Sequence, residues 1–73
     1  MITSKILGKS YKTKATYKTQ INKYEKMIEE LLIDLLKCKE LGWRLYLGDP
    51  ILPQIRECRS ELSRVGKEKT SNL

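Results

Sequence analysis

Two runs of apolar residues, each advancing by alternate steps of four and three, constrain the fold of this chain more than any other feature. The first run is Tyr17, Ile21, Tyr24, Ile28, Leu31, Leu35 and Cys38, and the second is Ile51, Ile55, Cys58, Leu62 and Val65. A mean step of about 3.5 residues places these side chains on one stripe of a helix, and a second helix must cover such a stripe. The sequence therefore predicts two amphipathic helices that pack against each other.

The first helix is predicted to begin near residue 16, where Thr13 or Thr16 can cap it. Its end has two interpretations. Gly42 can end it with a Schellman cap, or the helix continues until the Gly-Asp-Pro stretch at 48–50 stops it. The pattern slightly favours the longer helix because Leu45 continues the apolar stripe, although a glycine inside a helix costs about 1 kcal/mol.

The second helix is predicted to begin with Asp49 as its N-cap and to end at Gly66. The residues before the first helix lack a sustained period, and residues 67–72 are all polar. The predicted organisation is therefore a basic N-terminal arm (1–15), a helical hairpin (16–66) and a disordered tail (67–73).

A turn centred on Gly48 also predicts the register of the hairpin and an oligomer. It sets Cys38 level with Cys58, Leu35 with Leu62, Leu31 with Val65, Leu41 with Ile55 and Leu45 with Ile51. The first helix then extends about four turns beyond the second, and the stripe of this overhang lacks an intrachain partner. The predicted fold class is all-α, an antiparallel hairpin of one long and one shorter helix, completed as a dimeric coiled coil or four-helix bundle. The predicted oligomer interface consists of Tyr17, Ile21, Tyr24, Ile28, Leu31, Leu32 and Leu35.

The composition excludes most classes of enzyme. The 73 residues include no histidine, so no imidazole is available for a catalytic triad, a proton shuttle or a metal site. Cys38 and Cys58 lie on the predicted stripes, where free cysteine packs as a small apolar residue, and a redox-dependent crosslink between them is the alternative. We expect no catalytic residue, metal, cofactor or small-molecule substrate.

The sequence also predicts where the protein resides. It shows no secretory apolar segment and no run of roughly 20 apolar residues that could cross a bilayer. Two cysteines without a cysteine-rich spacing are typical of a reducing compartment. We therefore expect a cytoplasmic protein without a membrane partner.

The positive charge is unevenly distributed along the chain. The net charge is +6, and residues 1–26 hold seven lysines and one acid. Lysines can neutralise phosphates, and the interleaved Tyr11 and Tyr17 could stack on bases. An acidic protein surface, or a basic end that is merely solvated, explains the same pattern. The residues predicted to bind nucleic acid are Lys9, Lys12, Lys14, Lys18, Arg56 and Arg59.

Trp43, Arg44 and Tyr46 form an aromatic and arginine cluster near the predicted turn. These residue types are enriched at the centres of protein interfaces, so the cluster is the predicted partner-binding site. Packing at the end of the hairpin explains Trp43 equally well.

One short stretch resembles a known family. Residues 48–51 (Gly-Asp-Pro-Ile) and 59–64 (Arg-Ser-Glu-Leu-Ser-Arg) are slightly similar to the helical-hairpin phosphatases of bacterial response regulators, whose second helix carries Ser-Gln-Glu-Leu-Asp. Ser63 stands where that signature has its essential aspartate, and Arg59 stands where it has its first serine. The resemblance therefore implies no phosphatase activity.

The sequence thus predicts a small, non-enzymatic regulatory or inhibitory protein, of the kind that phages and mobile elements encode. It would bind a larger protein through a helical face. The alternative is a homodimer that binds nucleic acid through its lysine-rich arm.

Overall fold

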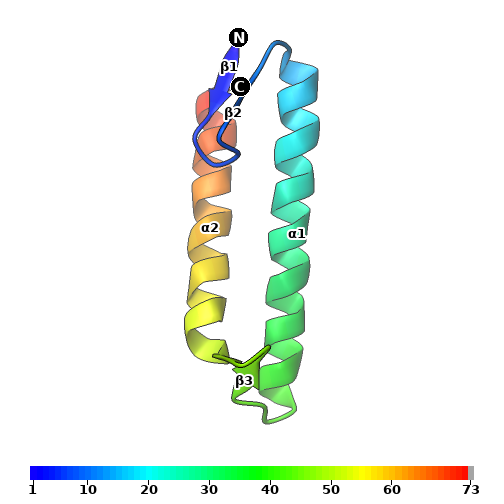
Figure 1. Ribbon diagram of the computed structural model, residues 1–73, viewed down its shortest axis with the longest axis vertical. Coiled ribbons are helices and arrows are strands. Elements are labelled where there is room, and N and C mark those ends of the chain that lie inside the picture. The colour runs from blue at the N-terminus through cyan, green and yellow to red at the C-terminus, as the bar shows by residue number, and fades with distance from the viewer. Residues whose placement is uncertain (73) are drawn as a thin grey trace.

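The structure, a computed structural model, describes residues 1–72 without the side chain of Asn72, and it consists of two antiparallel helices and two short β-hairpins. The elements are β1 (Ile2–Ser4), β2 (Lys9–Tyr11), α1 (Lys14–Glu40), β3 (Leu45–Tyr46), β4 (Asp49–Pro50) and α2 (Ile51–Asn72). The two helices lie side by side along a rod of 46 × 19 × 15 Å (Figure 1). The predicted helical hairpin is confirmed, but the fold is not purely α-helical.

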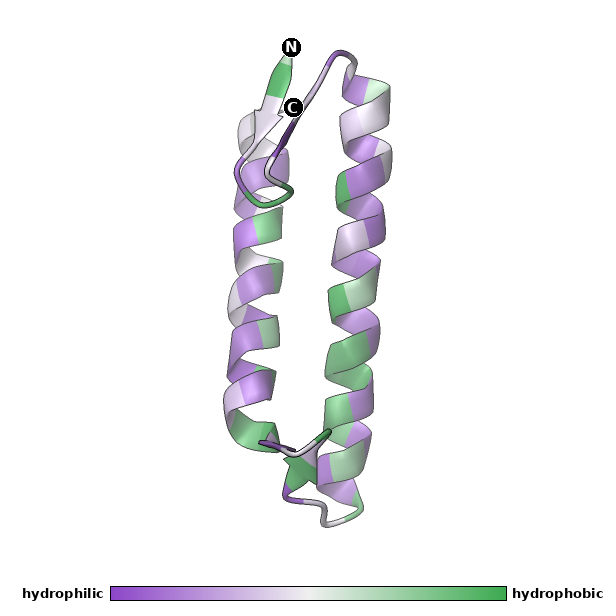
Figure 2. Cartoon of the chain, in the orientation of Figure 1, coloured by the Kyte–Doolittle hydropathy of each residue, from purple (hydrophilic) through white to green (hydrophobic). Residues whose placement is uncertain are grey.

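The two ends of the rod differ, and we name them by their residues. The tip (residues 41–52) joins the helices and contains β3 and β4 (Figure 1). The open end (residues 1–26 and 61–72) contains the β1–β2 hairpin, the first half of α1 and the end of α2. Apolar residues of α1 concentrate in the half of the helix nearer the tip (Figure 2).

Helix α1 ends at Glu40, two residues before Gly42, so the interpretation that continued it to residue 47 is wrong. Gly42 has a φ of 84°, in the left-handed region that glycine enters without a steric penalty. Its N–H donates to the carbonyl of Lys39 (3.0 Å), and the N–H of Trp43 donates to the carbonyl of Cys38 (2.9 Å). This pair of bonds is a Schellman motif, which satisfies two carbonyls that the helix leaves unpaired.

Both helices begin close to the predicted positions. The side-chain oxygen of Thr13 accepts a hydrogen bond from the N–H of Thr16 (3.2 Å), which confirms Thr13 as the N-cap of α1. Helix α2 begins at Ile51, and Asp49 lies in strand β4 two residues earlier, so the prediction that Asp49 is the N-cap is wrong. Pro53 falls within the first turn of α2, where its missing N–H costs no helical hydrogen bond.

The buried apolar residues form two clusters, and all of them lie on the predicted stripes. The cluster nearer the tip comprises Leu35, Ile51, Ile55 and Cys58, and Cys38 packs against it. The cluster at the open end comprises Tyr17, Ile21 and Val65. The stripes therefore identified the core correctly, and both cysteines contribute to it as free thiols.

The register between the helices differs from the prediction. Val65, expected level with Leu31, instead shares a cluster with Ile21, ten residues earlier in α1. Leu35, expected level with Leu62, packs with Ile51 and Ile55. The reason is the early end of α1: the connection is a β-hairpin rather than a tight turn, so α2 reaches further toward the start of α1.

The first eleven residues, predicted as part of a basic N-terminal arm, form a β-hairpin. Strands β1 and β2 pair antiparallel, and Ile2, Ile6, Leu7 and Tyr11 pack against the cluster at the open end. This hairpin and α2 cover the part of α1 that was predicted to extend without an intrachain partner. The premise for an oligomer through that overhang is therefore not met.

Glu68 of α2 fixes this hairpin by accepting three hydrogen bonds. One carboxylate oxygen accepts from the backbone N–H groups of Lys5 (2.6 Å) and Ile6 (3.2 Å), and the other accepts from the hydroxyl of buried Ser4 (2.9 Å). The hydroxyl of Ser4 also accepts from the N–H of Leu7 (2.9 Å). A carboxylate thus satisfies backbone donors that the turn leaves unpaired.

The prediction that Gly66 ends the second helix is wrong, because α2 continues to Asn72. Thr70 donates to the carbonyl of Gly66 (3.0 Å), and Lys69 forms an ion pair with Glu25 (3.2 Å). Most of the predicted tail is therefore helical, while Leu73 lies outside the described residues. No helix within residues 1–72 combines the length and the apolarity that a bilayer span requires.

Candidate functional site

The tip gathers exposed apolar side chains. Five of the exposed large apolar residues among residues 1–72 belong to it: Leu41, Trp43, Leu45, Leu47 and Leu52. Leu47 is 89% exposed and Trp43 is 58% exposed. Single exposed apolar residues are ordinary on protein surfaces, but a contiguous group is typical of an interaction site.

The backbone of the tip is well defined by hydrogen bonds. The N–H of Ile51 donates to the carbonyl of Arg44 (3.0 Å), and the side-chain amide of Gln54 donates to the carbonyls of Tyr46, Asp49 and Pro50. Leu47 and Gly48, between β3 and β4, have φ values of 53° and 84°. Two positive φ values define a type I′ turn, the geometry that matches the twist of a two-residue hairpin.

Leucine is an unusual residue for the first central position of this turn. A type I′ turn favours asparagine, aspartate or glycine there, and a non-glycine residue in the left-handed region costs on the order of 1–3 kcal/mol. We therefore expect Leu47→Asn to raise the free energy of unfolding by about 1 kcal/mol, measured by urea denaturation.

Leu45→Asn is the matched control for this prediction. Leu45 is also an exposed leucine, but it lies in strand β3 with a negative φ, so its replacement relieves no strain. If both variants lose stability to the same extent, the backbone of Leu47 is not strained.

A cavity of about 420 Å³ lies beside the exposed apolar residues of the tip. It is lined by Lys39, Trp43, Arg44, Pro50, Ile51, Leu52 and Pro53. Two of these side chains are cationic and none is acidic. The cavity can thus receive an apolar side chain whose neighbours carry negative charge.

The three predicted partner-binding residues differ in their exposure to solvent. Trp43 and Arg44 are exposed at the tip, whereas Tyr46 is half-buried and packs against the cluster that contains Leu35. The sequence left packing and binding open for Trp43. Its exposure places it on the surface available for binding, and Tyr46 provides the packing.

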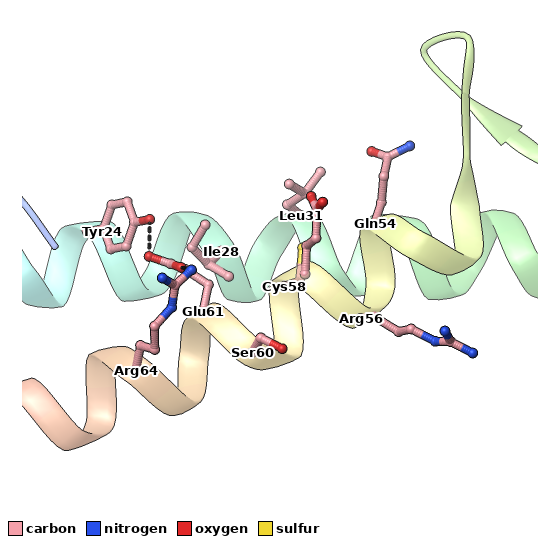
Figure 3. Close-up of a pocket in the computed structure, with 10 residues that line it drawn as sticks. Tyr24, Ile28, Leu31, Gln54, Arg56, Cys58, Ser60, Glu61 and Arg64 are labelled. Atoms are coloured by element: carbon pink, nitrogen blue, oxygen red, sulfur yellow. Dashed lines mark hydrogen bonds and ion pairs between the residues drawn. The ribbon is translucent and has the colours of Figure 1, made fainter.

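A groove of about 470 Å³ runs along the side of the rod. Figure 3 shows Tyr24 of α1 pointing toward Glu61 of α2, to which its hydroxyl donates a hydrogen bond of 2.7 Å. Arg64 forms an ion pair with the same carboxylate. The hydrogen bond to Glu61 is the main cause that raises the pKa of Tyr24, and burial adds to it.

This side groove lacks the features of an activated catalytic site. Burial, followed by the charge of Glu57, raises the pKa of the Cys58 thiol above its usual value, which disfavours the nucleophilic thiolate. The carboxylate of Glu61 is already engaged by Tyr24 and Arg64. Within residues 1–72, no group of three or more cysteine and acidic side chains lies close enough together to hold a metal ion.

The residues predicted to bind nucleic acid are only partly brought together. Lys9, Lys12, Lys14 and Lys18 are exposed at the open end. Arg56 and Arg59 are exposed nearer the tip, and Arg56 lies about 16 Å along α2 from Lys67 at the open end. At the open end, the cations near the N-terminal lysines are Lys5, Arg64 and Lys67 instead of Arg56 and Arg59. The reason is that β1 lies against the end of α2.

The predicted oligomer interface is largely inside the single chain. Tyr17, Ile21 and Leu35 are fully buried, and Tyr24, Ile28, Leu31 and Leu32 are partly buried. The fully buried residues therefore present no surface to a second copy. Association through the partly buried residues stays a prediction.

Two pairs of exposed leucines at the tip were not predictable as surface residues. The apolar pattern predicts Leu41 and Leu45 in the seam between the helices, and it singles out neither Leu47 nor Leu52. The turn signal at 48–50, taken together with Gly42, was the only indication that this segment leaves the helix.

No protein-family model, curated protein or solved structure matches the chain.

Proposed function

We propose that this chain is a non-enzymatic binding protein that docks on a larger protein through its tip. The observation that supports this most is the cluster of exposed apolar side chains on a hydrogen-bonded loop, with Leu47 held in a conformation that leucine disfavours. A loop that only connects two helices has no need of an exposed leucine at that position. Retaining one there is consistent with a role in binding.

The preorganised backbone supports the same proposal. Gln54 bonds to three carbonyls of the tip, and the Schellman motif fixes the orientation of Trp43 relative to α1. A loop that is ordered before binding loses less conformational entropy when its partner docks. Docking of this kind would make the chain a regulator or inhibitor of its partner, and the free thiols of Cys38 and Cys58 suit a reducing compartment such as the cytoplasm.

The proposal predicts that a double variant, Trp43→Ser with Leu47→Asn, folds normally and loses partner binding. Both side chains are exposed, so we expect unchanged helix content and a loss in affinity of about 30-fold or more, the effect of removing an interface hot spot. The measurement is a comparison of the proteins that immobilised wild type and variant retain from cells of the source organism.

Met27→Ser is the matched control, since Met27 is an exposed apolar residue on α1 away from the tip. The proposal requires a protein that wild type and control retain and the double variant releases. If all three retain the same proteins, the tip is not the docking surface.

A second copy of the chain is the competing occupant of the tip. Sedimentation of the wild type over a range of concentrations measures this directly. A dimer that the double variant abolishes would assign the tip to self-association and contradict docking on a different protein.

A further inference from the structure

The fold concentrates positive charge at the open end of the rod. The open end holds ten lysine and arginine residues and three acids, a net charge of +7, whereas residues 27–60 hold five bases and six acids, a net charge of −1. The sequence places only part of this charge in the N-terminal segment. The antiparallel packing of α2 adds Arg64, Lys67 and Lys69 to it.

The three acids of the open end are all engaged within the protein. Glu25 pairs with Lys69, and Glu61 pairs with Arg64 and accepts from Tyr24. The carboxylate of Glu68 accepts from β1 and the turn that follows it. Each of these carboxylates therefore already has a partner within the chain.

The remaining lysines of the open end are exposed, and none has a carboxylate within 4 Å among the described residues. They are Lys5, Lys9, Lys12, Lys14, Lys18, Lys23, Lys26 and Lys67. They belong to β2, α1, α2 and the two connections that flank β2, which together form one end of the rod. Unpaired cations this close together repel one another, and a bound polyanion relieves that repulsion.

A cavity of about 360 Å³ is lined by two of these lysines, Lys5 and Lys67, together with the hydroxyl residues Thr3 and Ser71. Arg64, which pairs with Glu61, also lines it. Glu68 and Ile6 complete the lining, and the Glu68 oxygens already accept three hydrogen bonds. Cationic side chains beside hydroxyl groups are the usual donors to phosphate oxygens in nucleic-acid complexes.

The two tyrosines interleaved with the N-terminal lysines, Tyr11 and Tyr17, pack against each other instead of projecting side by side into solvent. Tyr17 is fully buried, and the centre of its ring lies 5.9 Å from that of half-buried Tyr11. The prediction that Tyr17 stacks on bases is therefore wrong, and Tyr11 is partly covered by its contact with Tyr17. What the open end presents to a polynucleotide is charge and hydroxyl groups.

From these observations we propose that the open end binds the phosphate backbone of nucleic acid without reading its bases. The proposal goes beyond docking at the tip, because it concerns the opposite end of a rod 46 Å long. Both ends can thus be occupied at the same time. A membrane surface fits less well, because Met1 is the only fully exposed large apolar side chain that the described open end could insert beside its cations.

Fluorescence anisotropy with labelled 20-nucleotide DNA, as a single strand and as a duplex, tests the proposal. If about four phosphates are neutralised, the slope of log K against log salt is about −3.6 on duplex, so affinity falls about 150-fold between 50 and 200 mM salt. Duplexes of unrelated sequence are expected to bind with affinities within about threefold of one another. The two DNA forms show which backbone is preferred, and binding to either supports the proposal.

The test variant is Lys5→Gln, Lys14→Gln and Lys67→Gln combined, and the control is Lys37→Gln, Arg56→Gln and Arg59→Gln combined. Each removes three exposed positive charges, so the net charge changes equally. We expect the test variant to bind at least tenfold more weakly at 50 mM salt, with a slope shallower by about 2–3, and the control to keep the wild-type slope. Circular dichroism shows whether each variant is folded.

Four results would overturn the proposal. These are no binding to either DNA at 50 mM salt, equal losses in the two variants, a preference of more than tenfold for one sequence, and equal or tighter binding to polyglutamate or to vesicles containing phosphatidylserine. The last result would assign the open end to an acidic protein or to a membrane.

Discussion

An Ile21→Ala variant is expected to lose about 2–5 kcal/mol of its free energy of unfolding, measured by urea denaturation. Ile21 is 0% exposed, between Tyr17 and Val65, so alanine would leave a cavity at the centre of the open-end cluster. A domain of this size is stabilised by roughly 4–11 kcal/mol in total. The variant should therefore lose much of its stability.

Ile33→Ala is the matched control, because Ile33 is the same residue type on the same helix and is 51% exposed. We expect it to change the free energy of unfolding by less than about 1 kcal/mol. Equal losses in the two variants would show that Ile21 is not buried as described. Repeating the measurement at two protein concentrations tests where the burial occurs, since a midpoint that rises with concentration would indicate that a second copy contributes.

The second large effect is expected at Glu68. Glu68→Gln should lower the free energy of unfolding by about 1.5–3 kcal/mol. Removing the charge weakens the bonds from the N–H groups of Lys5 and Ile6, and an amide cannot accept at both of its atoms. The loss should be local. Hydrogen exchange of the Lys5 and Ile6 amides should become at least about tenfold faster, while the amides in the middle of α1 keep their protection.

Glu57→Gln serves as the control for this charge change, because Glu57 is exposed on the same helix and accepts no hydrogen bond among the described residues. It should leave exchange of the N-terminal hairpin unaltered. Undiminished protection of Lys5 and Ile6 in Glu68→Gln would mean that apolar packing alone, and not the carboxylate, holds the hairpin.

The core could be predicted from the sequence because helical periodicity is a local signal. Each buried residue of the two clusters lies on one of the two stripes that advance by four and three. The stripe shows which face of a helix is buried, but it does not show which part of the partner helix covers that face. That depends on where the first helix ends.

The register was predicted wrongly because two stop signals competed. Leu45 continues the apolar stripe, which favoured a helix running past Gly42. In the structure the Schellman bonds at Gly42 and the β3–β4 pairing satisfy the backbone of this segment, so Leu45 becomes an exposed strand residue. The backbone hydrogen bonds of the cap and the β-hairpin therefore determine where α1 ends, and the apolar pattern contains no information about them.

The N-terminal hairpin and the last turns of α2 could not be predicted because they depend on each other. Residues 1–11 show no helical period, and Gly66 is a plausible helix end. Glu68 joins the two segments by binding to backbone N–H groups, which are present in every sequence and so leave no specific signature. The contact between the N-terminal hairpin and the end of α2 also forms the cavity at the open end.

The candidate sites were predicted in part. Trp43 and Arg44 were identified by residue type alone, and Lys9 to Lys18 by their density. The apolar pattern predicted Leu41 and Leu45 in the seam between the helices because leucine on a stripe is usually buried, and it singled out neither Leu47 nor Leu52. Only the positive φ values of Gly42, Leu47 and Gly48 show that the chain has left the helix and turned its apolar residues outward.

The bonds of Glu68 span 62–64 residues of sequence, almost the whole chain. During translation, the strands of the first hairpin leave the ribosome long before this carboxylate has been synthesised. Closing so long a loop costs more entropy than forming the turns of a helix, so contacts of this kind form late. The hairpin should therefore assemble after the two helices have met, and under mechanical load it should be the first part to detach.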